Sequence, residues 1–150
     1  MSDLTRIRKR FSKPGFAPKL RALGDILRYA IPGAALLFIA VSGDGDLAWD
    51  WIAVIAVTQV VTEILKKLFN FTPLGERPDG KDDSMPSGHA SGAFSGAWVF
   101  YFVYGPVAAI VPLLLATLTA ASRVVSKRHH WYDVTAGALV ALVIAHNFLT

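Results

Sequence analysis

The chain has 150 residues, of which 53% are hydrophobic, and a mean hydropathy of +0.44. A chain of this size is too apolar for an ordinary soluble domain, so we expect it to lie in a membrane. The lack of cysteine excludes disulfides, thiolate catalysis, cysteine-ligated zinc and iron–sulfur centres. The net charge of +4 is compatible with nucleic acid, but no nucleic-acid motif accompanies it, so membrane lipids are the expected partner.

Residues 1–22 are rich in Arg and Lys and contain Pro14 and Pro18, which predicts a basic arm lying on anionic headgroups. A membrane domain is predicted over residues 23–150. Its apolar runs are 26–42, 51–68, 90–104, 107–121 and 134–149. These runs predict an all-α, integral-membrane bundle of five transmembrane helices. A cleaved signal peptide is the competing interpretation of the first run, because residues 40–42 resemble a cleavage site.

Small residues recur at four-residue spacing in two of the predicted helices. They are Gly88, Gly92 and Gly96 in the third, and Gly137, Ala141 and Ala145 in the fifth. This spacing lets helix backbones approach closely in lipid, which favours a compact bundle within one chain. A dimer interface is the alternative, and the oligomeric state stays open.

Three polar segments contain nearly all the histidine, arginine and lysine outside the basic arm. They are residues 77–78, 86–89 and 122–133. Counting helices places all three at the same end of the bundle as the N-terminus. Because arginine offers a forked, permanently charged set of donors that suits phosphate oxygens, the three segments predict an anion site.

Residues 86–89 read Pro-Ser-Gly-His and open the third predicted helix. Ser87 can cap that helix, and Gly88 lets a bound group approach the backbone, where free N–H groups favour phosphate. Taken alone, the tetrapeptide is also explained by a plain helix cap next to an interfacial His89.

His129 and Asp133 stand four residues apart at the start of the fifth predicted helix. On one helical face they lie within hydrogen-bonding reach, so the carboxylate can fix the imidazole tautomer. The other ring nitrogen is then free to attack an electrophile. The structural alternative is that Asp133 caps the helix and His129 lies at the membrane interface.

In this order, the three segments resemble the motifs of the type 2 phosphatidic acid phosphatase (PAP2) family of membrane lipid phosphatases. That family shares its site with the vanadium haloperoxidases. The matching residues are Arg77-Pro78, Pro86-Ser87-Gly88-His89, and Ser122-Arg123 followed by His129 and Asp133. The resemblance spans about residues 60–149.

The resemblance implies a metal-independent phosphatase without a cofactor, acting through a phosphohistidine intermediate. By position, His129 would be the nucleophile, Asp133 its orienting residue, and His89 the acid that protonates the leaving oxygen. The residues implied to bind the phosphoryl oxygens are Arg77, Ser87, Gly88, Arg123 and a lysine. Because His129 must be neutral while His89 is protonated, we expect the rate to peak near neutral or mildly acidic pH.

Two features depart from the family pattern. The family usually has a lysine seven positions before the arginine of its first motif, and that position is Asn70 here. The candidate replacements are Lys66, Lys67 and Lys81. We favour Lys67, which ends the second predicted helix and has Glu63 four residues before it; the alternative is a lysine that only snorkels to the interface. In addition, family members commonly have six helices, whereas the sequence predicts five here.

The expected substrate is a lipid phosphate that enters from the bilayer. The candidates are phosphatidic acid, phosphatidylglycerophosphate, diacylglycerol pyrophosphate, polyprenyl pyrophosphate and lipid A. The rival class is a membrane protein that binds lipid phosphate without hydrolysing it, and the intact pair of His129 and Asp133 argues against it. All fifteen Lys and Arg fall at the end shared by the N-terminus and the motifs. The positive-inside rule therefore favours a cytoplasmic active site in a multi-pass membrane protein, with the bacterial inner membrane as the expected location.

Overall fold

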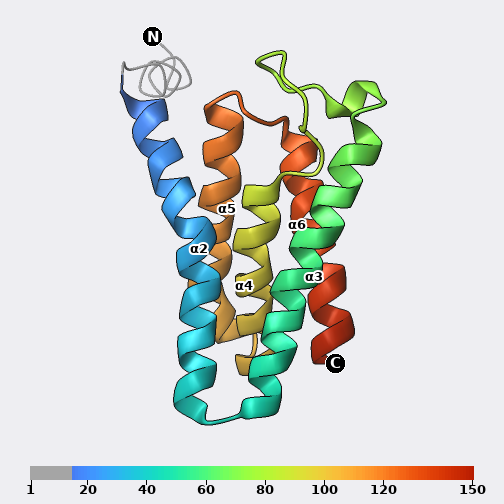
Figure 1. The fold of residues 1–150 in the computed structure, drawn as a ribbon. Helices are drawn as coiled ribbons and strands as arrows, with labels where there is room; N and C mark the ends of the chain where they lie inside the picture. The colour runs from blue at the N-terminus through green and yellow to red at the C-terminus, as the bar shows by residue number, and fades with distance from the viewer. Residues whose placement is uncertain (1–14) are drawn as a thin grey trace.

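The computed structural model describes residues 15–150, which form five α-helices lying side by side (Figure 1). The helices are α2 (Phe16–Ser42), α3 (Gly45–Phe69), α4 (Gly88–Tyr104), α5 (Pro106–Val125) and α6 (Trp131–Leu149). A short 3₁₀ turn, η1 (Pro73–Gly75), lies in the long loop between α3 and α4. The prediction of an all-α protein with five helices is confirmed.

Two helices begin well before the apolar runs that predicted them. α2 starts at Phe16, so residues 16–22 are helical rather than part of a separate arm. Pro18 does not break the helix, because the first-turn N–H groups have no partner within a helix. α3 starts at Gly45, because the Asp44 side chain accepts a hydrogen bond of 3.0 Å from the N–H of Leu47. The remainder of the predicted arm lies outside the described residues.

α4 is the central helix of the bundle and contacts all four of the others (Figure 1). Its small residues allow this position. A Cβ added to Gly96 would lie 2.6 Å from the Cα of Pro32 in α2, and one added to Gly137 in α6 would lie 2.6 Å from the carbonyl oxygen of Ser87. The small residues therefore bring backbones together within one chain.

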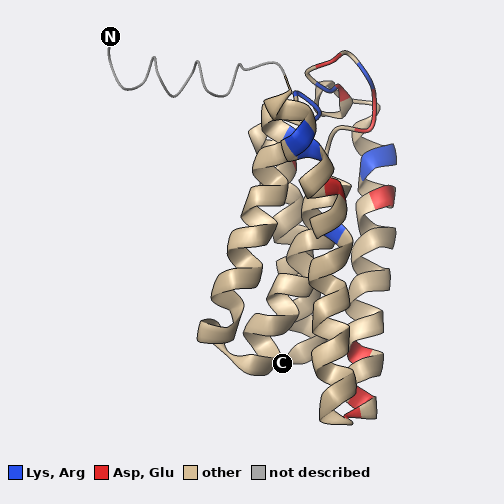
Figure 2. Ribbon diagram, turned by 90° about the vertical axis from the view of Figure 1, so that its left-hand side faces the viewer, with Lys and Arg blue, Asp and Glu red and all other residues tan. Residues whose placement is uncertain are grey.

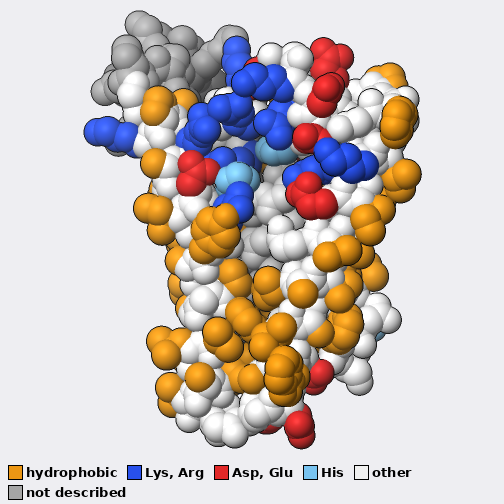
Figure 3. All heavy atoms as spheres, viewed as in Figure 1, with side chains coloured by type: hydrophobic (Ala, Val, Ile, Leu, Met, Phe, Trp, Pro, Cys, Tyr) orange, Lys and Arg blue, Asp and Glu red, His pale blue; other side chains and the backbone are white. Residues whose placement is uncertain are grey.

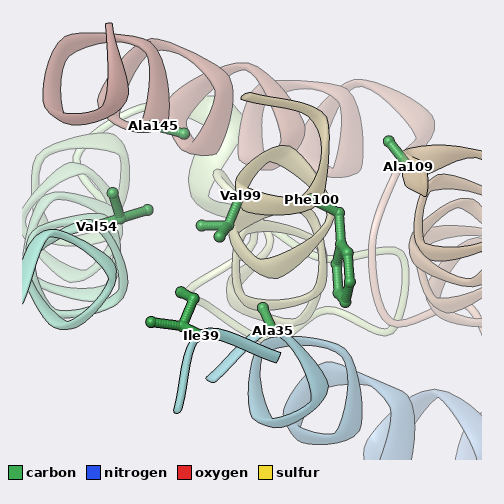
Figure 4. Close-up of a cluster of buried hydrophobic side chains, with 7 residues drawn as sticks. All are labelled: Ala35, Ile39, Val54, Val99, Phe100, Ala109 and Ala145. Atoms are coloured by element: carbon green, nitrogen blue, oxygen red, sulfur yellow. The ribbon is translucent and has the colours of Figure 1, made fainter. Parts of the chain in front are cut away.

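Buried apolar side chains form three clusters among the described residues, and the cluster with the most members lies toward the end of the bundle opposite the start of α2. All five helices contribute buried side chains to it (Figure 4). They are Ala35, Ile39, Val54, Val99, Phe100, Ala109 and Ala145. This cluster fixes the helices at one end, and the loops that join α3 to α4 and α5 to α6 gather at the other.

Large apolar side chains cover much of the outer surface (Figure 3). Val41, Val107 and Leu114 are 81%, 80% and 65% exposed, as expected for side chains that face lipid. By length and composition, α2, α5 and α6 are each able to cross a membrane. α4 has 17 residues and is largely enclosed by its neighbours. The molecule is thus a membrane protein, and five passes stay a prediction.

Charged residues divide along the long axis of the bundle. Figure 2 shows Lys and Arg gathered toward the end where the N-terminus lies, whereas only acidic residues mark the opposite end of the described part. Those acidic residues are Asp44, Asp46 and Asp50, at the turn between α2 and α3 and in the first turns of α3. The predicted asymmetry of charge is therefore present in the fold.

Candidate active site

A cavity of about 250 Å³ opens at the basic end of the bundle, where Figure 3 shows arginine, lysine and histidine side chains around a hollow. Residues from α2, α3, α4, α5 and two loops line it. Its basic residues are Arg21, Arg28, Lys66, Arg77, Arg123 and Arg128, and its acidic residues are Asp25 and Glu63. The excess of positive charge makes this cavity suitable for an anion. Within residues 15–150, no group of three or more His, Asp or Glu side chains is placed to hold a metal ion.

His129 lies in the loop between α5 and α6 and lines this cavity. The carbonyl oxygen of Arg123 accepts hydrogen bonds from the N–H groups of Arg128 at 2.9 Å and His129 at 3.3 Å, which fixes the loop against the end of α5. The His129 side chain is 5% exposed, and its Nδ1 lies 3.6 Å from Oδ2 of Asp133. This distance exceeds that of a hydrogen bond, but catalytic contacts are often long before substrate binds.

Asp133 lies in the first turn of α6 and its side chain is fully buried. Its Oδ2 accepts hydrogen bonds from the hydroxyl of Ser84 at 2.5 Å and from the N–H of His130 at 2.7 Å. These two donors hold the carboxylate in place beside the His129 ring. The predicted pairing of His129 with Asp133 is thus present as a close approach. Ser84 is an additional hydrogen-bond partner of the Asp133 carboxylate.

Burial lowers the pKa of His129 below its usual value of 6.5. The charge of Arg77 acts in the same direction, whereas Asp133 opposes it. Desolvation disfavours the charged imidazolium, so the ring is neutral at neutral pH. A neutral imidazole is the form that can act as a nucleophile.

The start of α4 brings Ser87, Gly88 and His89 to the same cavity region. The N–H of Ser87 donates to the carbonyl oxygen of Asp133 at 2.9 Å, which ties α4 to α6. Ser87 occupies the N-cap position, but its hydroxyl makes no capping bond and has no partner among residues 15–150. Gly88 and His89 both line the cavity, and a Cβ added to Gly88 would lie 3.2 Å from Nζ of Lys66.

Arg123, near the end of α5, is held by α2, the first helix that the structure describes. Its Nη1 donates to Oδ1 of Asp25 at 2.8 Å, and its Nη2 donates to the carbonyl oxygen of Arg21 at 2.6 Å. A Cβ added to Gly24 would lie 2.9 Å from the same Nη2, so a glycine is needed for α2 to lie this close. The guanidinium is 3% exposed and is therefore set in one orientation at the cavity wall.

Arg77 lies in the loop between α3 and α4, and its position depends on Asp83. Its Nη2 and Nε donate to the Asp83 carbonyl oxygen at 3.1 and 3.4 Å. Asp83 in turn forms two hydrogen bonds with the Asn70 side chain, at 2.8 and 3.0 Å. The Asn70 hydrogen bond lowers the pKa of Asp83, with help from Lys67 and Lys66. Asn70 therefore fixes the loop that presents Arg77.

A family model described as the PAP2 superfamily matches residues 47–150, which is more than half of the chain. The chain belongs to the PAP2 superfamily. All of the predicted motif residues lie within the matched region, and so do helices α4 to α6 and nearly all of α3.

Several curated proteins resemble this PAP2 chain. The lipid A 4′-phosphatase of Helicobacter pylori is 36% identical over 140 residues, which cover 86% of this chain and 69% of that protein. The diacylglycerol pyrophosphate phosphatase 1 of Saccharomyces cerevisiae is 35% identical over 43% of this chain, and the lipid A 1-phosphatase of Porphyromonas gingivalis is 39% identical over 45%. The matches span 27% and 16% of those two proteins. No solved structure matches the chain significantly.

The structure does not place Lys67 at the PAP2 cavity. Its Nζ lies 3.6 Å from Oδ1 of Asp83, and its side chain is 72% exposed. Lys66 lines the cavity instead, with its side chain 12% exposed and its Nζ 2.6 Å from Oε1 of Glu63. Successive helical residues point in directions about 100° apart, so only one of the two can face the cavity. Lys81 does not line the cavity either.

Several residues at or beside the site were not predicted as site residues. They are Gln59, Glu63 and Arg128 in the cavity wall, three residues of α2, and Ser84. Arg21, Asp25 and Arg28 come from α2, which the sequence indicated only as a basic arm and a lipid-facing span. Their spacing of four and three residues places them on one helical face. This spacing is the one feature of the sequence that could have indicated a polar face on α2. Ser84 gave no signal, because its contact with Asp133 joins positions 49 residues apart.

Proposed function

We propose that this protein is a membrane-embedded, metal-independent phosphatase that removes phosphate from a lipid phosphomonoester or pyrophosphate through a phosphohistidine intermediate. The observation that supports this most is His129, buried beside Asp133 in the wall of a cationic cavity. The named relatives are phosphatases, and this chain is a phosphatase of the same superfamily. Phosphoryl transfer needs chiefly positioned positive charge and in-line geometry, which such a cavity supplies.

In the first step, a neutral His129 nitrogen attacks phosphorus while the bond from phosphorus to the leaving oxygen breaks. His89 donates a proton to that oxygen, so the lipid leaves as an alcohol or, from a pyrophosphate, as a monophosphate. Arg77, Arg123 and Lys66 bind the phosphoryl oxygens, together with the N–H of Gly88. The unpartnered hydroxyl of Ser87 is a further donor beside them.

In the second step, water attacks the phosphohistidine. His89, now neutral, accepts a proton from the water, and the bond between His129 and phosphorus breaks. Inorganic phosphate leaves, and both histidines return to their starting protonation states. Asp133 remains ionised throughout and stabilises the positive charge that forms on His129.

A lipid substrate is supported by a second cavity next to the charged one. It also measures about 250 Å³ and shares Arg28, Gln59 and Gly88 with the charged cavity. Its other lining residues include Tyr29 and Pro32 of α2 and Ile55 of α3. We propose that the phosphate binds in the charged cavity and that the adjoining apolar part of the lipid lies between these two helices.

We further propose that the protein crosses the membrane several times and that the site opens on the cytoplasmic side. The basic end of the bundle supports this side, because basic residues are retained in the cytoplasm. Cysteines introduced at Lys81 and at Asp50, one at each end of the bundle, test it with a membrane-impermeant thiol reagent. Labelling of the Lys81 site only after the membrane is opened supports a cytoplasmic site; labelling of that site in intact cells contradicts it.

The experiment that tests the proposed function is phosphate release in detergent from a panel of lipid monophosphates and pyrophosphates, with EDTA present. The wild type should release phosphate. His129→Ala should lower the rate of release by at least about 10⁴-fold, because the covalent step disappears. An acid-labile ³²P label should appear on the wild type alone. A variant that keeps its rate, or activity abolished by EDTA, would contradict the proposal. The preferred member of the panel identifies the substrate.

A further inference from the structure

One acidic residue of the cavity lies outside the region that matches the PAP2 model. Asp25 is on α2, and the family match begins at residue 47. Its Oδ1 lies 2.8 Å from Nε2 of His89 and accepts a hydrogen bond of 2.8 Å from Nη1 of Arg123. One carboxylate oxygen therefore joins the proposed acid to a proposed phosphate-binding arginine.

The surroundings of His89 are otherwise cationic. Nη1 of Arg28 lies 3.3 Å from Nδ1 and 3.2 Å from Nε2 of the ring, and Arg123 contacts the same Asp25 oxygen as the ring does. Nearby positive charge disfavours a protonated imidazole, whereas an acid catalyst needs one. Among the described residues, Asp25 is the carboxylate that contacts this ring.

We infer that Asp25 is a positioning residue for the proposed acid: it orients the His89 ring and stabilises the proton that His89 transfers to the leaving oxygen. This inference rests on the proposed function. During transfer the proton moves from His89 to the leaving oxygen as the bond from that oxygen to phosphorus breaks. Asp25 stays ionised and accepts the hydrogen bond of the ring before and after the step. Helix α2 thus completes a site whose other parts lie in the matched region.

The packing of α2 is suited to this role. Gly24 lets the helix lie against Arg123, and the carbonyl oxygen of Arg21 accepts a second hydrogen bond from that guanidinium. Asp25 is therefore presented from a helix that is held against Arg123 by residues one and four positions before it. A rival explanation is that Asp25 occupies the place of the substrate phosphate and is displaced when substrate binds.

The two explanations differ in how they depend on the leaving group. The leaving group of a short-chain phosphatidic acid is the diacylglycerol, a strongly basic alkoxide that needs a proton. The leaving group of p-nitrophenyl phosphate is a weakly basic phenolate, which needs little help from an acid. We would measure kcat/KM for both, because this constant reports formation of the phosphohistidine. Asp25→Asn should lower kcat/KM by about 10- to 100-fold for phosphatidic acid and by a much smaller factor for the nitrophenyl ester.

The variants include a rescue, a reference and a control. Asp25→Glu should restore most of the lost activity, and His89→Ala should show the same selectivity with a larger loss. Asp50→Asn, an exposed carboxylate at the opposite end of the bundle, should leave both rates unchanged. Weaker phosphate binding through Arg123 would lower kcat/KM equally for both esters. The ratio of the two kcat/KM values therefore isolates the contribution of proton transfer.

Three results would overturn the inference. Equal losses for the two esters in Asp25→Asn would make Asp25 a structural or phosphate-binding residue. Higher kcat/KM with tighter inhibition by inorganic phosphate would make it a competitor of the substrate phosphate. If His89→Ala itself shows no selectivity, the proposed acid is wrong and the role of Asp25 fails with it. A selective His89→Ala beside an unselective Asp25→Asn rejects this inference alone and leaves the proposed function standing.

Discussion

Two histidine–aspartate pairs adjoin the same cavity, and they are built differently. His129 and Asp133 are four residues apart, at the start of α6, and their side chains are 5% and 0% exposed. His89 and Asp25 are 64 residues apart, on α4 and α2, and their side chains are 22% and 46% exposed. The first pair is enclosed by its own loop and helix, and the second joins two helices across the cavity.

The difference fits the two tasks that we propose. A nucleophile benefits from burial, because desolvation keeps the imidazole neutral. Burial, together with the charges of Arg123 and Arg28, also lowers the pKa of His89, to about 4, and Asp25 opposes this, so the proposed acid depends on that carboxylate for its proton. The comparison also separates a local pair, which the sequence reveals, from a tertiary pair, which it does not.

The largest effect is expected at the buried pair. Asp133→Asn should lower kcat by about 10³- to 10⁴-fold, because the amide cannot stabilise the positive charge that develops on His129. Unlike the loss in Asp25→Asn, this loss should be similar for phosphatidic acid and p-nitrophenyl phosphate. Steady-state kinetics with both esters provide the measurement.

Ser84→Ala is the matched control for this prediction, because it removes one donor to Asp133 and leaves the charge. It should cost far less than Asp133→Asn. If the two variants lose activity equally, Asp133 acts mainly by holding the loop. If Asp133→Asn is selective for the basic leaving group, the assignment of the two pairs must be exchanged.

A smaller effect is expected at the two adjacent lysines. Lys66→Met should lower kcat/KM by about 10²-fold, because it removes a charged donor from the cavity. Lys67→Met should have little effect, because its ammonium group lies beside Asp83 and is exposed. The two variants remove the same charge one residue apart. Equal losses would mean that bulk positive charge, rather than a defined contact, attracts the substrate.

Much of the site could be predicted because its signals are local. The spacing of His129 and Asp133 depends only on helical geometry, and the order of the motif segments indicated one end of the bundle. The five apolar runs gave the number of helices for the same reason. The histidine–aspartate spacing and each apolar run lie within a single turn or a single helix, where sequence separation and spatial separation agree.

The remainder depends on how helices pack against one another. Whether Lys66 or Lys67 faces the cavity is decided by the rotation of α3 about its axis, which the apolar pattern of a membrane helix constrains weakly. The contacts of Asp25 require α2 to lie against Arg123, and this approach depends on Gly24. A glycine in an apolar run carries no indication of which partner lies beside it.

The smallest effect expected is a shift in titration, and it tests the buried pair directly. Because burial lowers the pKa of His129 and Asp133 opposes this, the ring should titrate below pH 6.5, and still lower in Asp133→Asn. The sign follows because the lost carboxylate favoured the protonated ring. The ¹⁵N chemical shifts of labelled histidine, assigned with His129→Gln, provide the measurement in detergent. A midpoint at or above 6.5, or an upward shift in Asp133→Asn, would mean that His129 is solvated, and the contrast between an enclosed nucleophile and an open acid would then be wrong.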